Sequence, residues 1–246
     1  MAVECQAVHA GRCPTPQWSR PLARMRSPRL LTATFDGLQM TTLGRRVAVP
    51  HEGAVSSRTV LLFGLSWLLI ATALGAAGAV RALRPPGPPL VVLGLTAVVL
   101  VAGWLLTGFR AWLSAIDERW FVGLHLTRFV GAYFLYLYGQ GQLPYAFAVP
   151  GGWGDITVAS LAAILLVAGP PRHASRRSAY IVWNVLGLAD ILFVVATAAW
   201  LAAADPESMA ALLRLPLSLL PTFLVPLIIA SHVVLGVRLA HRSAVR

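Results

Sequence analysis

The chain has 246 residues, of which 57% are hydrophobic and only 12% are charged. A soluble domain usually carries about a quarter of charged residues, so this composition excludes an ordinary soluble protein and predicts an integral membrane protein. The net charge of +11 does not indicate nucleic-acid binding, because most arginines flank apolar runs and form no basic face with interleaved aromatic residues.

The first 58 residues are rich in Arg, Pro, Ser and Thr and contain no apolar run of the length that a secretory signal needs. This composition predicts a disordered, basic cytoplasmic tail over residues 1–58. Because Met40 begins a second start-like stretch, "MTTLGRRVAVPHEG", one hypothesis is that residues 1–39 come from a misassigned start codon. Cys5 and Cys13 lie in this tail without the spacing of a zinc site or a disulfide framework.

Six apolar runs follow the tail, each close to the ~20 residues that cross a ~30 Å hydrocarbon core. They lie at about 59–80, 89–108, 120–139, 145–169, 179–203 and 216–238. Arginines are in excess in every second connection, as expected for cytoplasmic loops. The sequence therefore predicts an all-α bundle of six transmembrane helices over residues 59–246, with both termini cytoplasmic. The heavy use of Ala, Gly, Val and Arg without Lys is typical of a GC-rich bacterial genome, so the expected location is a bacterial inner membrane.

Several polar side chains fall inside these runs, where each ionisable group costs roughly 2.5–3.5 kcal/mol and needs a partner or a function. They are His125 and Arg128 in the third run, Asp155 in the fourth, Asn184 and Asp190 in the fifth and His232 in the sixth. Counting 1.5 Å per residue from the cytoplasmic ends puts His125 level with His232, and Arg128 level with Asp190 near the midplane. The polar intramembrane site predicted from these positions comprises Arg128, Asp155, Asn184 and Asp190.

Each level pair has two interpretations. Arg128 and Asp190 are either a structural ion pair that holds two spans together, or a proton- or cation-binding carboxylate tuned by a neighbouring charge. His125 and His232 are either hydrogen-bonded between packed helices, or ligands of a metal or of a b-type haem in the bundle. No c-type haem motif and no doubled histidines accompany them. The sequence therefore predicts no cofactor, with a b-type haem as the alternative.

The stretch "FAVPGGWGDITVA", residues 147–159, contains residues that disfavour a helix. Pro150 cannot donate its backbone hydrogen bond, and Gly151 and Gly152 have low helix propensity. We therefore expect a break at Pro150, Gly151 and Gly152, with a helix that starts afresh near Trp153. Asp155 would then lie in the first turn, nearer the outer face, and either complement the helix dipole or line an outward-facing cavity.

Three segments, "LTRFVGAYFLYLYGQGQLPYAFAVPGGWGDITV", "WNVLGLADI" and "LPTFLVPLIIASH", together resemble an uncharacterised family of bacterial membrane proteins with about six spans. The resemblance covers about residues 120–235 and implies no activity. Its matching positions are Arg128, Gly131, Leu143, Pro144, Phe147, Ala148, Gly154, Asp155, Asn184, Gly187 and Asp190.

Three classes of function remain open at this point. The favoured prediction is a permease for a small solute, a proton or another ion, with a route past Asp155, Arg128 and Asp190. The alternatives are a redox protein or enzyme that uses His125 and His232 on haem or metal, and a non-catalytic assembly or sensory protein in which the polar groups only join helices. No catalytic motif is present, which favours a protein that is not an enzyme. The expected partners are the lipid bilayer, an unidentified small solute or ion and, as an open alternative, a second copy of the chain.

Overall fold

The computed structural model describes residues 53–244, with side chains to residue 241, and every regular element in this part of the chain is helical. The predicted tail and the hypothesis about residues 1–39 lie outside the described residues, apart from the last few positions of the tail. The elements are α1 (Ser57–Ala76), α2 (Gly87–Leu105), α3 (Thr107–Ala115), α4 (Glu118–Leu124), η1 (His125–Val130), α5 (Gly131–Gly139), α6 (Tyr145–Ala168), α7 (Ala174–Ala204), η2 (Pro206–Leu213), η3 (Leu220–Leu224) and α8 (Val225–Ala244).

Five helical segments within residues 53–244 are long and apolar enough to cross a membrane, namely α1, α2, α6, α7 and the segment Leu220–His241. Their outward faces carry large apolar side chains such as Leu61, Phe63 and Leu69 in α1, all more than half exposed. Such faces fit a surface covered by lipid. The third predicted run differs, because residues 118–139 form three successive segments, α4, η1 and α5, joined by a tight 3₁₀ stretch over His125–Val130.

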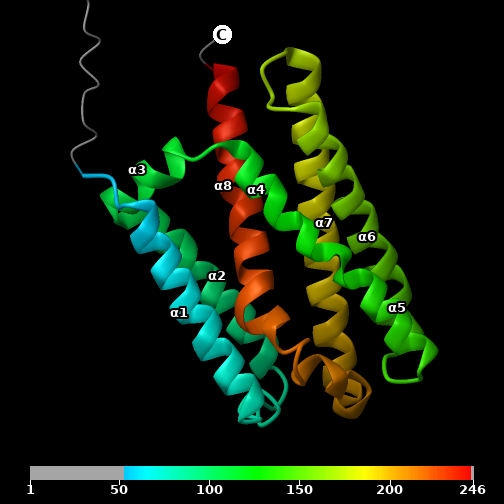
Figure 1. Cartoon of the computed structure of the whole chain (residues 1–246). Helices are drawn as coiled ribbons and strands as arrows, with labels where there is room; N and C mark the ends of the chain where they lie inside the picture. The colour runs from blue at the N-terminus through cyan, green and yellow to red at the C-terminus, as the bar shows by residue number, and fades with distance from the viewer. Residues whose placement is uncertain (1–52, 245–246) are drawn as a thin grey trace, which may run out of the picture. The chain divides into compact units, whose positions relative to one another are not determined.

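The helices of this part of the chain run back and forth along a common direction (Figure 1). The described chain begins and ends at one end of the bundle, here called the terminal end, and the connections 77–86, 140–144 and 205–219 lie at the opposite, far end. α6 packs on η1 and α5 on one side and on α7 on the other, α7 packs on α8, and α8 packs on α2. η1 and the middle of α6, α7 and α8 therefore lie in the interior of the bundle.

The expected helix break at Pro150, Gly151 and Gly152 is wrong, because α6 is continuous from Tyr145 to Ala168 with Pro150 inside it. The helix begins five residues before Pro150, so the proline removes only one hydrogen bond, to the Ala146 carbonyl, near the start of the helix. Transmembrane helices tolerate proline and glycine where neighbouring helices pack against the segment. The connection before α6 is correspondingly short, and Gly141, at φ 69°, makes its turn.

The glycines of α6 allow close helix contact rather than breaking the helix. A Cβ atom at Gly152 would lie 2.8 Å from the Gly131 carbonyl oxygen and 3.0 Å from Leu135 Cδ2. A Cβ atom at Gly131 would in turn lie 2.8 Å from Asp155 Cβ. Small residues at such contacts let the backbones of membrane helices approach each other, and here they bring η1 and α5 against α6.

The prolines of the last span lie where neighbouring groups accommodate the irregular backbone. Pro226 lacks the N–H that would reach the Thr222 carbonyl four residues earlier. That carbonyl accepts a 2.9 Å hydrogen bond from the Trp67 indole of α1, whose ring also lies edge-on to Phe223. The π-helical turn η3 and Pro226 of α8 therefore provide one contact between α1 and the rest of the bundle.

Alanine at two helical glycines should change stability in opposite directions. Gly94 of α2 has no heavy atom within 4 Å of an added Cβ, so Gly94→Ala should stabilise the protein by up to about 1 kcal/mol through helix propensity. Gly152→Ala gains the same propensity but forces α6 away from Gly131, and should destabilise by about 1–3 kcal/mol. Unfolding in mixed micelles with increasing denaturing detergent measures both, and a stabilised Gly152→Ala variant would contradict the close-packing argument.

Candidate functional site

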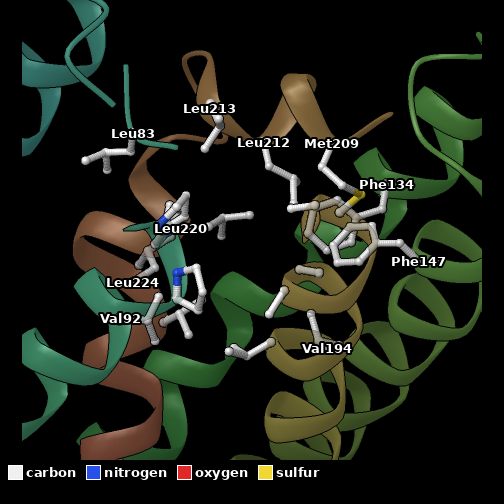
Figure 2. Close-up of a pocket in the computed structure, with 18 of the residues that line it drawn as sticks. Leu83, Val92, Phe134, Phe147, Val194, Met209, Leu212, Leu213, Leu220 and Leu224 are labelled. Carbon is white, nitrogen blue, oxygen red and sulfur yellow. The ribbon is translucent and has the colours of Figure 1, made fainter. Parts of the chain in front are cut away.

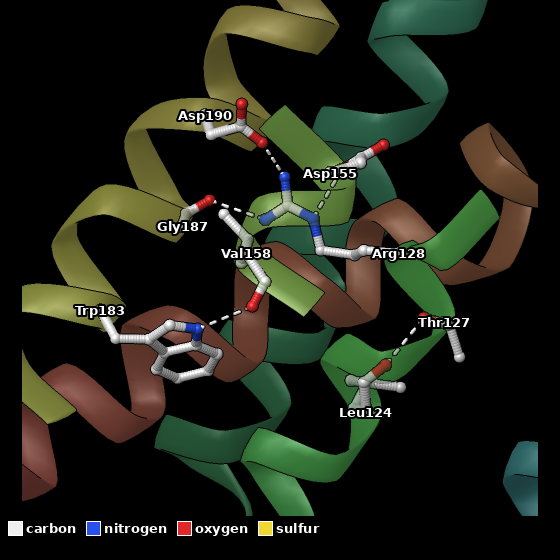
Figure 3. Close-up of polar contacts among 8 residues, drawn as sticks. All are labelled: Leu124, Thr127, Arg128, Asp155, Val158, Trp183, Gly187 and Asp190. Atoms are coloured by element: carbon white, nitrogen blue, oxygen red, sulfur yellow. Dashed lines mark hydrogen bonds and ion pairs between the residues drawn. The ribbon is translucent and has the colours of Figure 1, made fainter. Parts of the chain in front are cut away.

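Arg128 lies at the centre of a buried ionic cluster that joins three elements (Figure 3). Its Nε donates to Asp155 Oδ1 of α6 at 2.6 Å, its Nη1 donates to the Gly187 carbonyl of α7 at 2.9 Å, and its Nη2 forms an ion pair with Asp190 Oδ2 of α7. All three nitrogen atoms of the guanidinium group therefore donate hydrogen bonds, each to a different acceptor. This planar arrangement of donors makes arginine suited to buried pairs with carboxylates. We call Arg128, Asp155 and Asp190 the triad.

Local structure places each member of the triad. Arg128 projects from the 3₁₀ stretch η1, and a 3₁₀ turn within a longer helical run often marks a functional or strained position. Asp190 has room for its carboxylate because position 154 is glycine, where an added Cβ would collide with that carboxylate. The predicted pairing of Arg128 with Asp190 is thus present in the structure, and glycine in α6 is what makes room for it.

Asp155 does not lie in a first helical turn near the outer face, as the sequence led us to expect. It lies in the middle of α6, with its side chain 4% exposed, and it faces Arg128. The expectation failed because the start of the helix was placed near Trp153 instead of Tyr145, which moved Asp155 by about two turns, or roughly 12 Å at 1.5 Å per residue.

The triad holds unequal formal charge. One arginine faces two aspartates, with side-chain exposures of 1% for Arg128, 4% for Asp155 and 18% for Asp190. Within residues 53–241, no other basic side chain forms an ion pair with either aspartate. If both carboxylates are ionised, one negative charge remains uncompensated in a region of low polarity, where a charge without a partner is costly.

His125 and His232 form a second polar cluster, next to the triad. Their ring centroids are 4.2 Å apart, and the Trp183 ring lies edge-on to His125 at 4.9 Å. Asn184 joins this cluster rather than the triad: its Oδ1 pairs with His232 Nδ1 at 2.9 Å, and its Nδ2 donates to the His232 carbonyl at 3.1 Å. Gly187 connects the two clusters, because its carbonyl accepts from Arg128 and an added Cβ there would lie 2.6 Å from His232 Cε1.

The hydrogen bonds of the pair define its tautomers. Ser231 Oγ donates to the Ile228 carbonyl and therefore accepts from His125 Nε2, whereas Asn184 Oδ1 accepts from His232 Nδ1. His125 Nδ1 and His232 Nε2 have no hydrogen-bond partner among the described residues. Each neutral imidazole thus keeps one free lone pair in the interior.

A haem held between these histidines requires more space than the described arrangement provides. Axial histidines lie on opposite faces of a porphyrin, whereas these two rings contact each other directly. No group of three or more His, Cys, Asp and Glu side chains in the searched part of the chain could hold a metal ion. The haem alternative stays a prediction, and it would require the third and sixth runs to move apart.

The lining of an apolar cavity of about 680 Å³ extends from the far-end connections to Arg128 and Asp155. Figure 2 shows part of its apolar lining. Arg128 and Asp155 line it in the interior, and Arg81, Arg84 and Glu207 line it at the level of the far-end connections. The wall between these two levels is apolar. It includes Val92, Phe134, Phe147, Val194, Met209, Leu220 and Leu224.

Apolar packing fills the other side of the clusters, toward the terminal end. The core group there contains Phe121, Val122, Val158, Ala162, Leu165, Tyr180, Trp183, Leu235 and Leu239. At the terminal end, Arg238 links α8 to α3 and α4. It donates to Glu118 at 2.7 Å and to the carbonyls of Leu113 and Ile116 at the end of α3. The cavity lining thus reaches exposed residues at the far end, and a packed core lies between the clusters and the terminal end.

Sequence reasoning missed several of these features. No binding role for the cavity arginines Arg81 and Arg84 was predicted from the sequence, and neither was the ion pair between Glu118 and Arg238. The short helix α3 was missed, although Phe109, Trp112 and Leu113 have the spacing of an amphipathic helix. Asp205-Pro206-Glu207 is likewise a helix start signal, and it opens η2.

The fold and the site together fit a helical membrane protein with an ionic cluster at the inner end of an apolar cavity. The chain belongs to the family defined by a domain of unknown function, DUF8737, whose model matches residues 85–240. The matched region contains the triad, both histidines and most of the cavity wall, and it agrees with the resemblance found in the sequence. No curated protein and no solved structure matches the chain significantly.

Neutral substitutions in the triad should have unequal effects on stability. Arg128→Gln leaves two carboxylates facing each other and should cost about 3–5 kcal/mol, because breaking a buried ion pair strands charge. Asp190→Asn removes the excess negative charge and leaves Arg128 paired with Asp155, so its cost should stay within about 1 kcal/mol. Abundance in membranes and unfolding in mixed micelles measure both, with the exposed Arg172→Gln as the control. Equal stability of Arg128→Gln and Arg172→Gln would contradict the argument.

Proposed function

We propose that this protein is a permease-like membrane protein in which the triad carries a proton or a monovalent cation and the cavity admits a small, mainly apolar solute. The observation that carries the proposal is the excess carboxylate of the triad, at the inner end of a cavity that opens at one end of the bundle. One additional, exchangeable positive charge would make the triad neutral. Ionisable residues inside membrane bundles commonly serve ion and proton pathways.

The position of Asp155 supports exchange through the cavity. Asp155 and Arg128 both line the cavity, whereas Asp190, on α7, is not among its lining residues. A proton or cation that enters from the far end therefore meets Asp155 first. The packed core between the clusters and the terminal end supports a state that is open to one end and closed to the other, as alternating access requires.

The excess carboxylate also argues against the assembly or sensory alternative. A single carboxylate would neutralise Arg128, so charge neutrality needs either Asp155 or Asp190 but not both. The second carboxylate adds an unpaired charge in the bundle and contributes no further neutralisation. The second carboxylate also joins η1 to a second helix, but an uncharged acceptor would make that contact without the excess charge. We therefore propose a non-enzymatic transport role.

We further propose a topology of six crossings in a bacterial inner membrane, with both termini in the cytoplasm. The run 118–139 supports the sixth crossing, since at 1.5 Å per residue its helical segments extend about 33 Å, enough to cross a hydrocarbon core of ~30 Å. The excess of arginine at the terminal end supports the orientation, because cytoplasmic loops carry such an excess. The cavity would then open to the outer face.

Proton movement across a bilayer tests the proposed function. The full chain is reconstituted into vesicles made from a total lipid extract of the source membrane, with a trapped pH-sensitive dye, and a pH step is applied at clamped membrane potential. We expect wild-type protein to accelerate pH equilibration over protein-free vesicles. Asp155→Asn should return the rate to that of protein-free vesicles, because the triad can then no longer take up a proton.

Asp117→Asn is the matched control for this experiment. Asp117 is exposed at the terminal end and caps α4, and asparagine caps a helix equally well. It should therefore equilibrate like wild type. If a folded Asp155→Asn protein, judged by its unfolding transition, equilibrates as fast as Asp117→Asn, the proposed function is wrong.

Cysteine labelling tests the topology. In a chain with Cys5→Ser and Cys13→Ser, a single cysteine at Gln142, in the connection between α5 and α6, should react with a membrane-impermeant maleimide in intact cells. A single cysteine at Ser175, at the start of α7, should react only after lysis, because it lies at the opposite end. Labelling of both in intact cells, or of Ser175 alone, would rule out the proposed orientation.

A further inference from the structure

The far end of the cavity is lined by two arginines and one acidic residue. Arg81 and Arg84 lie in the connection between α1 and α2, and Glu207 lies in η2. Among the side chains that the structure describes, neither Arg81 nor Arg84 forms an ion pair. The entrance of the cavity therefore carries an excess of positive charge that is available to a ligand.

The apolar part of the cavity is about as deep as one leaflet of a bilayer. Ala203 near the end of α7 and Ile191 near its middle both line the cavity, and twelve helical residues separate them. This separation is about 18 Å at 1.5 Å per residue. Half of a hydrocarbon core of ~30 Å is ~15 Å, so the apolar wall matches the length of a chain that spans one leaflet.

We infer that the cavity binds one single-chain anionic amphiphile from the leaflet at the far end, with its acidic head group on Arg81 and Arg84 and its tail along the apolar wall toward Asp155. The inference rests on the proposed function, because it names the class of solute that enters the cavity. Arginine side chains bind carboxylate and phosphate groups through paired N–H donors.

The distribution of charge fixes the direction in which such a molecule lies. The inner end of the cavity is the triad, where Arg128 is already paired with two carboxylates, so an anionic head group would be repelled there. The entrance is the only cationic level of the cavity within the described residues, and it lies with the loops at the membrane surface. A volume of about 680 Å³ is in the range of roughly 300–1,000 Å³ for pockets that enclose a single small molecule.

Binding of amphiphiles with identical tails and different head groups tests this inference. Palmitate, hexadecyl phosphate and hexadecanol are added to the full chain in detergent, and bound molecules are counted by native mass spectrometry. We expect one palmitate or one hexadecyl phosphate per chain, and binding of neutral hexadecanol that is weaker by about tenfold or more, since it lacks the charge-assisted bonds. Comparison of the first two identifies the preferred acid group.

Two pairs of matched variants locate the binding. Ala198→Trp fills the cavity and should abolish binding of palmitate, whereas Ala196→Trp makes the same change on the exposed face of α7 and should not. The double variant Arg81→Gln, Arg84→Gln should weaken binding about tenfold or more, whereas Arg214→Gln, at the same end but outside the cavity, should leave it unchanged.

The inference is overturned if palmitate binds equally to Ala198→Trp and Ala196→Trp, or equally to the double variant and Arg214→Gln. Equal binding would mean that palmitate associates nonspecifically with the lipid-facing surface of the protein. Binding that favours hexadecanol also overturns it. The proposed function fails separately, through the proton experiment with Asp155→Asn. Loss of specific palmitate binding with intact Asp155-dependent proton movement therefore rejects the inference alone.

Discussion

The compensation of one buried cation determines much of the architecture. Arg128 lies in the interior of the bundle with 1% of its side chain exposed, where an unpaired guanidinium would be prohibitively expensive. Its three acceptors come from α6 and α7, so these helices must pass within hydrogen-bond distance of η1. The close approach in turn requires small residues at the contacts, which are Gly131, Gly152 and Gly154. The burial and pairing of Arg128 therefore account for the need for glycine at these three positions.

Much of the fold could be predicted from the sequence, because hydropathy in a bilayer is a strong constraint. The predicted ends of most spans agree with the helices to within about four residues, and the pairs Arg128 with Asp190 and His125 with His232 followed from counting depth along straight spans. Depth counting succeeds when the ends of both spans are known, and it held for His125 and Arg128 although a 3₁₀ stretch interrupts their run. It failed for Asp155, where the start of the helix was misplaced.

That error has a specific physical source. Helix propensity describes a segment exposed to water, where glycine and proline favour other conformations. In a bilayer the alternatives to a helix leave backbone groups without hydrogen bonds, so the helix persists and the glycines serve as contact surfaces. The same reasoning explains Pro226, whose missing N–H leaves the Thr222 carbonyl to the Trp67 indole. Neither contact has a local sequence signal, since each depends on a partner far away in the chain.

The two aspartates of the triad differ in their exposure and in their contact with the cavity. Asp190 is 18% exposed and lies outside the cavity wall, and its carboxylate occupies space that Gly154 leaves open. Asp155 is almost fully buried yet lines the cavity, which in the proposed function is the route by which a proton or cation reaches it. Arg128 needs only one of the two for neutrality. Because Asp190 already supplies that neutrality, the proposed function assigns the change of charge to Asp155, and protonation there would weaken the attraction of Arg128 to α6 relative to its attraction to α7. A proton at Asp155 would therefore loosen η1 from α6 while η1 stays paired with α7, which couples the cavity to the contact that holds the bundle together.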